Sequence, residues 1–499
     1  MSVTQETDSH VDVLSSTTEA SSLEKPYAVA FREDSKAKQA VRKLDMTILP
    51  IMTMFYLLSF LDRSNIANAR VAGLQKSLHM TDKQYQIAVT TTFVPYIFAE
   101  LPSNLLLRKI GPNILMPTIL TIWGIILTLH GVISSYRGLI VARAFLGLVE
   151  GPMFPGIVLY LSGFYTRKEL SLRIALFFSA ASLSGAFSGL LAAAIVKMNG
   201  VGGRPAWAWI FILEGLFSVL VGLLSFLLVP ATPKDSRFLD EREKEIITRR
   251  LERDRPFVNP LDQFSMKQVF ASMTSPHVII MFVVYFMGGT SLYGLALFLP
   301  SIVNQLGFSP NESQLLSVGP ATISSVTVIA AYLSDKHRSR ALPLIIISFL
   351  AVAGLVIYLT STNKHLLYGS LYLMVPGIYG KTPVVAAWIS NNSEPYYRRA
   401  TSIALGFIAT NAGGILSTWL YPTKEGPRFH KTTLINLIFT ILVIFLAAIN
   451  AAMLLRMNRQ KEISREKILS EFATEKEPDG GVRAWVELGD RHPDFRYVV

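Results

Sequence analysis

The chain has 499 residues, of which 51% are hydrophobic and only 16% are charged. This apolar content is too high for a soluble globular protein of that length and indicates a membrane protein. There is no cysteine, which excludes disulfides, thiolate metal sites and cysteine nucleophiles.

The formal net charge of +12 would also suit a nucleic-acid-binding protein, but its distribution argues against one. Basic residues gather before the first apolar segment and in the middle loop, at Lys25, Arg32, Lys36, Lys38, Arg42, Lys43, Lys234, Arg237, Arg242, Lys244, Arg249, Arg250, Arg253, Arg255 and Lys267. Such clusters beside membrane spans mark the cytoplasmic side, whereas the short loops alone leave the orientation open. We expect both termini and the middle loop in the cytoplasm, and no nucleic-acid partner.

Twelve apolar segments are long enough, at about 20 residues each, to cross a bilayer core of roughly 30 Å. In chain order they are 46–66, 84–107, 113–133, 138–161, 173–198, 206–229, 277–301, 313–335, 340–360, 365–391, 398–421 and 432–456. They divide the chain into a disordered cytoplasmic tail (1–45), a six-helix half (46–230), a cytoplasmic central loop (231–276), a second six-helix half (277–456) and a cytoplasmic C-terminal tail (457–499).

The two halves repeat the same sequence features. The fourth span of one half begins "PGIVLYLSGFYTRKELSLRIAL" at Pro155, and that of the other begins "PVVAAWISNNSEPYYRRATSIAL" at Pro383. Each has a serine seven residues later, a basic turn, and an "IAL" that opens the next span. Duplicated six-span halves are typical of transporters whose site lies between the halves, near the middle of the membrane.

The chain resembles the major facilitator superfamily. "YLSDKHRSR" (332–340) matches part of the family's loop motif G-x-x-x-D-R/K-x-G-R-K/R. Asp335, Lys336 and Arg340 fit the motif, whereas Arg338 and Ser339 depart from it. The resemblance implies an all-α membrane protein with twelve transmembrane helices in two pseudo-symmetric halves.

Within the superfamily, "FYLLSFLDRSNIANA", "ELPSNLLLRKIGP", "ARAFLGLVEGPMFPGI" and "WISNN" resemble the anion:cation symporters. The similarity is greatest to the fungal allantoate, nicotinate and pantothenate permease branch, over roughly residues 40–499. This resemblance implies a proton-coupled carrier of organic anions.

Several ionisable residues lie inside predicted spans. Each costs about 2.5–3.5 kcal/mol at the centre of a bilayer, so such groups normally face a cavity or a partner. Asp62 and Arg63 lie in span one, and Arg143 and Glu150 lie two turns apart on one face of span four. We expect the two acids and two bases to converge.

Two interpretations of this cluster stay open. It is either a salt-bridge network that only offsets its own burial, or a coupled site for an anion and a proton. In the second, Arg63 holds the substrate carboxylate through its planar fork of donors, while Asp62 and Glu150 accept protons so that they do not repel the anion. The resemblance implies the same roles, with Arg143 as the partner of Asp62 when the site is empty.

Other polar residues in the spans are candidates for substrate binding. Lys381 in span ten either selects the substrate by charge or points to the interface. Asn391 and Asn411 either donate to the substrate or join helices, and Tyr96 either lines the cavity or packs as an aromatic side chain.

Three further polar residues have expected places outside the substrate site. Glu100 and Glu214 are expected to brace loops and helix ends. Asn311 begins the triplet Asn-Glu-Ser in a predicted outer loop and is a candidate glycosylation site.

The sequence therefore predicts proton-coupled uptake of a small organic anion. Nicotinate or a similar vitamin-like acid is the expected substrate on resemblance, with allantoate, pantothenate, biotin-like acids and sugar acids as alternatives. A sugar-type uniporter is disfavoured because a neutral solute needs no buried cation. A non-transporting nutrient sensor is the remaining alternative.

No enzyme is expected, because the His-Glu-x-x-His and G-x-S-x-G motifs are absent. We expect no cofactor and no metal, with the proton as coupling ion. The expected protein is a monomer in the lipid bilayer of the plasma membrane, with the endoplasmic reticulum or another internal membrane as the alternative.

Overall fold

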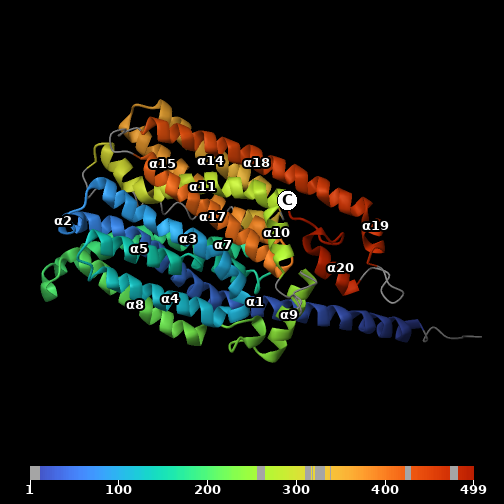
Figure 1. Ribbon diagram of the computed structural model, residues 1–499. Helices are drawn as coiled ribbons and strands as arrows, with labels where there is room; N and C mark the ends of the chain where they lie inside the picture. The colour runs from blue at the N-terminus through green and yellow to red at the C-terminus, as the bar shows by residue number, and fades with distance from the viewer. Residues whose placement is uncertain are drawn as a thin grey trace, which may run out of the picture.

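A computed structural model describes residues 12–254, 265–308, 316, 319–320, 332–337, 339–421, 429–472 and 481–499. The described residues form helices and connecting turns, with no strand among them. Most of the helices run along one common axis and form a single long bundle (Figure 1).

The first half contains α1 (Asp12–Val71), α2 (Leu74–Ser77), α3 (Asp82–Ile110), α4 (Pro112–His130), α5 (Tyr136–Glu150), α6 (Met153–Leu161), α7 (Leu170–Ile195) and α8 (Ala206–Leu228). All six spans predicted here coincide with these helices, and α2 is a short turn of helix between the first two.

The second half contains α11 (Pro276–Gln305), α14 (Ala341–Thr360), α15 (Lys364–Tyr379), α16 (Lys381–Asn391), α17 (Tyr396–Leu420) and α18 (His430–Ile463). Five of its six predicted spans coincide with these helices. The remaining one, 313–335, lies largely outside the described residues.

Four short helices lie outside these spans: α9 (Glu241–Asp254), α10 (Met266–Met273), α19 (Arg465–Ser470) and α20 (Gly481–Leu488). They gather at one end of the bundle, and α2 lies at the other (Figure 1). Because the basic middle loop lies here, we call this end the cytoplasmic end.

Helix α1 is longer than the predicted span. It begins at Asp12, where the sequence predicts a disordered tail up to residue 45. The last part of this stretch is held in place by charged contacts. Lys43 pairs with Glu243 of α9 at 2.7 Å, and Asp45 pairs with Arg173 of α7 at 2.8 Å. These contacts fix α1 to the cytoplasmic end of its half.

The fourth span of each half is broken into two helices. Helix α5 ends at Glu150 and α6 starts after Pro152, while α15 ends at Tyr379 and α16 starts after Gly380. Prolines follow each break and cannot donate a backbone hydrogen bond to the preceding turn. The repeat seen in the sequence therefore places an interruption at the same level in both halves.

Helices α4 and α8 touch through their backbones. A Cβ atom added to Gly124 would lie 2.7 Å from the Val219 nitrogen, and one added to Gly222 would lie 2.8 Å from the Thr121 nitrogen. Only glycine permits so close an approach along this contact.

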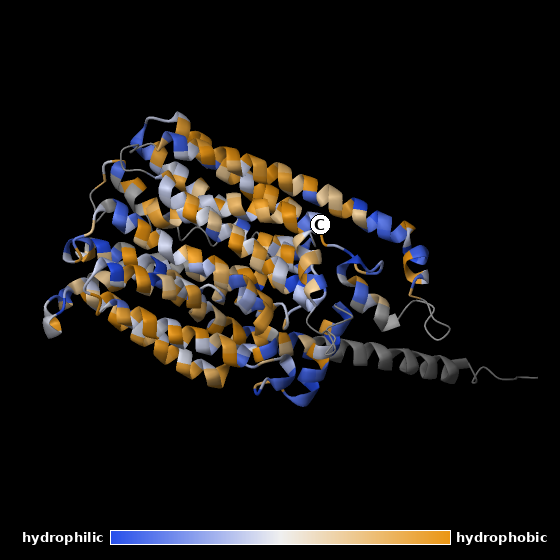
Figure 2. Cartoon of the chain, viewed as in Figure 1, coloured by the Kyte–Doolittle hydropathy of each residue, from blue (hydrophilic) through white to orange (hydrophobic). Residues whose placement is uncertain are grey.

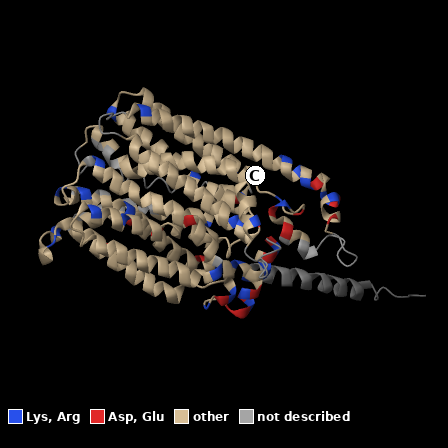
Figure 3. Cartoon of the chain, viewed as in Figure 1, with Lys and Arg blue, Asp and Glu red and all other residues tan. Residues whose placement is uncertain are grey.

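The outer surface of the bundle is apolar (Figure 2). Leu227 of α8, for example, is 70% exposed, which is unfavourable in water and favourable in lipid. Eight of the described helices are long and apolar enough to cross a membrane. Charged residues lie mainly at the ends of the bundle, with a few inside it (Figure 3).

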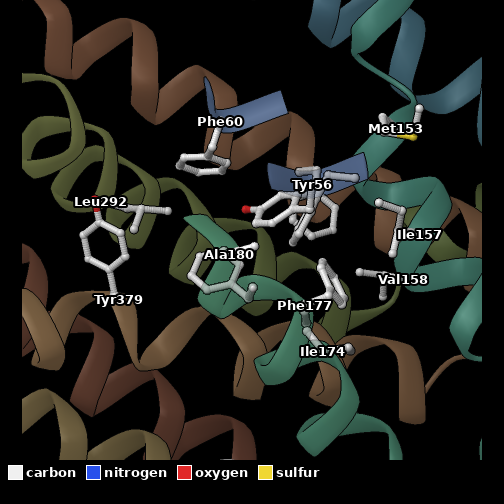
Figure 4. Packing of buried hydrophobic residues seen from close by; sticks show 14 of the residues in the cluster. Tyr56, Phe60, Met153, Ile157, Val158, Ile174, Phe177, Ala180, Leu292 and Tyr379 are labelled. Carbon is white, nitrogen blue, oxygen red and sulfur yellow. The ribbon is translucent and has the colours of Figure 1, made fainter. Parts of the chain in front are cut away.

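Aromatic side chains fill the centre between the halves (Figure 4). The Tyr56 ring lies 4.6 Å from that of Phe154 and 5.3 Å from that of Phe177, both in the first half. Phe154 in turn meets Phe407 of α17 edge-on at 4.4 Å. Tyr56 of α1, which belongs to this aromatic layer, precedes Asp62 and Arg63 by less than two turns of the helix.

Candidate functional site

The centre of the site is an ion pair between α1 and α5. Arg63 Nε donates to Glu150 Oε1 at 3.1 Å, and the Ser59 hydroxyl donates to the same oxygen at 2.7 Å. Glu150 is the last residue of α5, at the break in span four. The structure thus brings Arg63 and Glu150 together as predicted.

The rest of the Arg63 guanidinium is held by two tyrosines. It donates to the Tyr96 hydroxyl of α3 at 2.5 Å and to the Tyr293 hydroxyl of α11. The guanidinium carbon also lies 5.1–5.5 Å from the ring centres of Tyr96, Tyr293 and Phe60. Arg63 therefore contacts both halves, and Tyr96 belongs to the site rather than to aromatic packing alone.

The chain of hydrogen bonds continues through the second half. The Tyr293 hydroxyl donates to Asn411 Oδ1 at 2.8 Å, and Asn411 Nδ2 donates to Glu100 Oε1 of α3 at 2.7 Å. Asn411 also donates to the Phe407 carbonyl. A continuous route of polar contacts thus runs from Arg63 of the first half through the second half and back to Glu100 of the first.

Asp62 lies in a neighbouring polar cluster of the first half. Asn65 Nδ2 donates to Asp62 Oδ1 at 3.3 Å and also to Glu214 Oε2 of α8. Asp62 and Glu214 are each at most 3% exposed. The expectation that Glu100 and Glu214 brace loops and helix ends is wrong, because both lie inside long helices and in these buried networks.

Arg143 is buried close to these acids, but it does not pair with Asp62. No hydrogen bond or ion pair joins the two within the described part of the chain. The Arg143 guanidinium instead lies 5.6 Å from the Phe211 ring centre. The predicted partnership of Arg143 and Asp62 is therefore not formed in this conformation.

The buried site has more acids than bases. Four carboxyls and two guanidinium groups give a formal charge of −2 when all are ionised: Asp62, Glu100, Glu150, Glu214, Arg63 and Arg143. One oxygen each of Asp62, Glu100 and Glu214 has no hydrogen-bond partner among the described residues. Because an unpaired buried carboxylate is costly, this arrangement is suited to holding protons.

Lys381 lies apart from this network. Its side chain is buried at the start of α16, in a small pocket that Tyr285, Thr382 and Thr410 help to line. Its ammonium has no hydrogen-bond partner among the described residues. The structure therefore points Lys381 into the second half rather than to the interface.

Asn391 lies at the cytoplasmic end of the bundle rather than with Arg63. Its amide donates to the Arg167 carbonyl at 3.0 Å, across the boundary between the halves. The predicted substrate-binding residues Asn391 and Asn411 thus occupy different levels of the molecule, and only Asn411 belongs to the Arg63 network.

The loop motif joins the halves at the same end. Arg340 pairs with Asp335, whose carboxylate accepts the Leu172 amide of α7 at 2.7 Å. Arg340 also donates to the Arg167 carbonyl at 2.7 Å, whereas Lys336 is exposed. The motif therefore closes the cytoplasmic end. The predicted glycosylation site, Asn311, lies outside the described residues.

Several contributors to the site were not predicted from the sequence: Ser59, Asn65, Glu100, Glu214 and Tyr293. Tyr293 carries no charge, and nothing in its sequence context separates it from the many tyrosines of the spans. Glu100 did carry a signal, since it is an acid in the middle of a predicted span.

Comparisons with known proteins agree with this architecture. Residues 52–418 match the model of the Major Facilitator Superfamily. A high-affinity nicotinic acid transporter of Saccharomyces cerevisiae is 32% identical over 92% of this chain and 85% of its own length. A transporter of Schizosaccharomyces pombe is also 32% identical, over 94% of each chain.

A solved structure shows the same fold. The proton:xylose symporter XylE, bound to 6-bromo-6-deoxy-D-glucose, aligns with a TM-score of 0.62 and 16% identity over 80% of this chain and 94% of its own. The twelve-helix fold class predicted from the sequence is confirmed. The chain is therefore a member of the major facilitator superfamily, a multi-pass membrane transporter and not an enzyme.

Proposed function

We propose that the chain is a proton-coupled symporter that takes up a small organic anion, with nicotinate or a similar vitamin-like carboxylate as its substrate. The observation that carries this proposal is the contact of the partly buried Arg63 with the buried Glu150 and with tyrosines of both halves. A partly buried guanidinium held by an exchangeable carboxylate is a ready receptor for the carboxylate of a substrate.

Competition for Arg63 provides the coupling. When the substrate carboxylate takes the place of Glu150 on Arg63, Glu150 keeps only the Ser59 hydroxyl as a donor. A carboxylate left in that position is unfavourable unless it binds a proton. Substrate and proton therefore bind together, and each raises the affinity of the other.

Asp62 is the second candidate proton carrier. It shares Asn65 with Glu214, and one of its oxygens has no described partner. One proton per monoanion makes transport electroneutral, whereas a second proton adds about 2.3 kcal/mol per 100 mV of membrane potential. The number of protons thus depends on whether Asp62 and Glu150 both titrate during the cycle.

Two observations favour an aromatic carboxylate such as nicotinate. Tyr96, Tyr293 and Phe60 surround the Arg63 guanidinium with ring faces, against which a planar acid can stack. A relative that is 32% identical is a nicotinic acid transporter. We place the chain in the anion:cation symporter branch, with allantoate, pantothenate and other carboxylates as the competing substrates.

Lys381 is proposed as a second contact for the substrate. A buried ammonium without a described partner attracts an anion or a ring nitrogen. Because Lys381 lies in a separate pocket, we propose that it contacts the substrate at a different step of the transport cycle from Arg63.

Transport into proteoliposomes tests the proposal. With an inward proton gradient, the protein should accumulate radiolabelled nicotinate, and collapse of the gradient with a protonophore should stop accumulation. The Glu150→Gln variant should still exchange labelled for unlabelled substrate but should not accumulate it. Gradient-independent uptake would contradict symport, and uptake of another acid from a panel in place of nicotinate would reassign the substrate.

The same assay separates a carrier from a sensor, because a sensor would bind substrate without counterflow. We further propose that the protein acts as a monomer in the plasma membrane. Fluorescence microscopy of a tagged chain and light scattering of the detergent-solubilised protein test these two points.

A further inference from the structure

The final part of the chain, Gly489–Val499, folds back against the cytoplasmic end of the bundle (Figure 1). We call it the docking segment. Phe495 and Tyr497 within it are less than 10% exposed. It is therefore packed against the helices rather than extended into solvent.

Two asparagines of the second half hold the backbone of the docking segment. Asn392 donates to the Val498 carbonyl at 2.8 Å and accepts the Val498 amide at 2.7 Å. Asn458 of α18 makes the same pair of bonds with Tyr497, both at 2.9 Å. These paired bonds fix the extended backbone in one register.

Charged residues add to this docking. Asp490 forms a buried ion pair with Arg398 of α17, and Lys461 of α18 donates to the Asp490 and Phe495 carbonyls. Trp388 of α16 also donates to the Val498 carbonyl at 2.9 Å, so the docking segment is attached to α16, α17 and α18 of the second half through both its backbone and its side chains.

One residue of the first half also holds the docking segment. The Arg167 guanidinium lies 4.8 Å from the Phe495 ring centre, and Arg167 donates to the Arg496 carbonyl at 3.4 Å. Arg167 belongs to the turn between α6 and α7. Its own carbonyl accepts from Arg340 and Asn391, and its guanidinium also donates to the Asp254 carbonyl of α9 at 2.9 Å, so Arg167 is held by the middle loop, the second half and the docking segment together.

We infer that the docking segment is a latch of the cytoplasmic gate. It moves with the second half and holds the first half through Arg167, so that it stabilises the conformation in which the cytoplasmic end is closed. Many contacts join the segment to the second half and few join it to the first. When the halves separate at this end, the Arg167 contacts break and the segment stays attached.

A cysteine reporter tests the latch without any substrate, so the test is independent of the proposed function. The chain has no cysteine, and Ser171 is fully buried beside Leu172, whose amide bonds to Asp335 across the gate. In Ser171→Cys, a membrane-impermeant maleimide added to inside-out vesicles should label the protein only when this end opens.

In that background, Phe495→Ala should be labelled about tenfold faster, because it loses the cation–π contact with Arg167. Phe495→Tyr keeps the ring face and should be labelled at the original rate. Asp494→Asn is the matched control, since the Asp494 pair with Arg465 is about half exposed and lies away from the gate. Equal labelling of Phe495→Ala and Asp494→Asn would overturn the inference.

A second variant keeps the test valid if Phe495→Ala does not fold. Arg167→Gln removes the cation from the first half while the segment keeps its partners in the second half, and it should show the same acceleration. Conversely, a reducible bis-thiosulfonate cross-linker that joins Arg167→Cys to Phe495→Cys, in a chain with Ser171 restored, should abolish transport until the link is reduced, because it spans the gap left by the two long side chains. Full transport by protein whose cross-link has been verified would also overturn the latch.

Discussion

Arg63 of α1 and Tyr293 of α11 are hydrogen-bonded across the boundary between the two halves. The Tyr293 hydroxyl donates to Asn411, and the Asn411 amide donates to Glu100 of the first half. The centre of the carrier is therefore linked in both directions. When Arg63 changes its partner, hydrogen bonds to both halves change, which is the kind of coupling that alternating access requires.

Tyr293→Phe keeps the aromatic ring and removes both of these hydrogen bonds. With about 1 kcal/mol for each bond, the half-saturation concentration should rise roughly 5- to 30-fold. The measurement is the initial rate of uptake against substrate concentration. Tyr165→Phe is the control, because Tyr165 lies outside the Arg63 network and its hydroxyl has no hydrogen-bond partner among the described residues; a similar loss there would refute the assignment.

Asp62→Asn preserves the shape of the side chain and removes its ionisation. If Asp62 carries a proton, uptake should lose its stimulation by external acid, and Arg63 should still bind substrate. Uptake between about pH 5 and pH 8 checks this, with purified protein to confirm folding. Unchanged pH dependence would leave Glu150 as the proton carrier and make transport of a monoanion electroneutral.

Lys381→Met should have opposite effects on stability and transport. Removal of an unpartnered buried ammonium should raise the melting temperature by a few degrees, since a stability gain of about 1 kcal/mol shifts a protein this large only slightly. Substrate affinity should fall if Lys381 binds the anion. A stabilised variant with unchanged affinity would remove Lys381 from the site.

Gly147→Ala should strongly impair folding, because its Cβ would overlap the backbone carbonyl of Thr92 where α5 crosses α3. We expect a loss of at least about 3 kcal/mol, seen as poor expression and a lowered melting temperature. Gly156→Ala is the matched control. No atom lies within 4 Å of the Cβ that it adds, so it should be tolerated.

The cytoplasmic pair of Glu169 with Arg250 should make stability depend on pH. Burial would raise the pKa of Glu169, but the Arg250 guanidinium and hydrogen bonds from Arg250 and Thr166 hold the pKa below its ordinary value of 4.5. A lowered pKa means that the pair stabilises the fold above about pH 4.5 and that this contribution is lost as the pH falls through the lowered value.

The expected contribution of the Glu169–Arg250 pair is about 0.5–1 kcal/mol, because both side chains are partly exposed. Melting curves of wild type and Glu169→Gln should therefore differ at pH 7 and converge as the pH falls below the lowered pKa of Glu169. Glu245→Gln removes an exposed pair and should have no measurable effect at either pH. A constant difference between wild type and Glu169→Gln at all pH values would contradict this origin.

The sequence predicted the spans that the described residues cover and three of the charges in the site. Apolar length located the helices, and the cost of charge in lipid singled out Asp62, Arg63 and Glu150. It did not reveal which charges touch. Arg143 contacts the Phe211 ring and does not pair with Asp62. Which of the two it contacts depends on the rotation of the helix about its axis, and composition does not predict that rotation.

The same limit applies to Asn391 and to the docking segment. Asn391 shares its residue type with Asn411, yet it lies at the gate because the 11 residues of α16, about three turns, carry it away from the break in span ten. Phe495 contacts Arg167, and Val498 bonds to Asn392. In both pairs the two residues are more than a hundred positions apart in the sequence. Such pairings follow from tertiary packing and have no local pattern.

The backbone contact of α4 with α8 also bears on motion. At these glycines the two helices meet backbone to backbone, so no side chains lie between them that could repack and let the helices slide. Helices α4 and α8 therefore form a rigid pair along the lipid side of the first half. Any swing of that half must then be taken up elsewhere, at its connecting turns and at the interruption beside Glu150. A bulky substitution at the contact between α4 and α8 should therefore weaken the rigid movement of the first half and slow transport, while substrate selectivity stays unchanged.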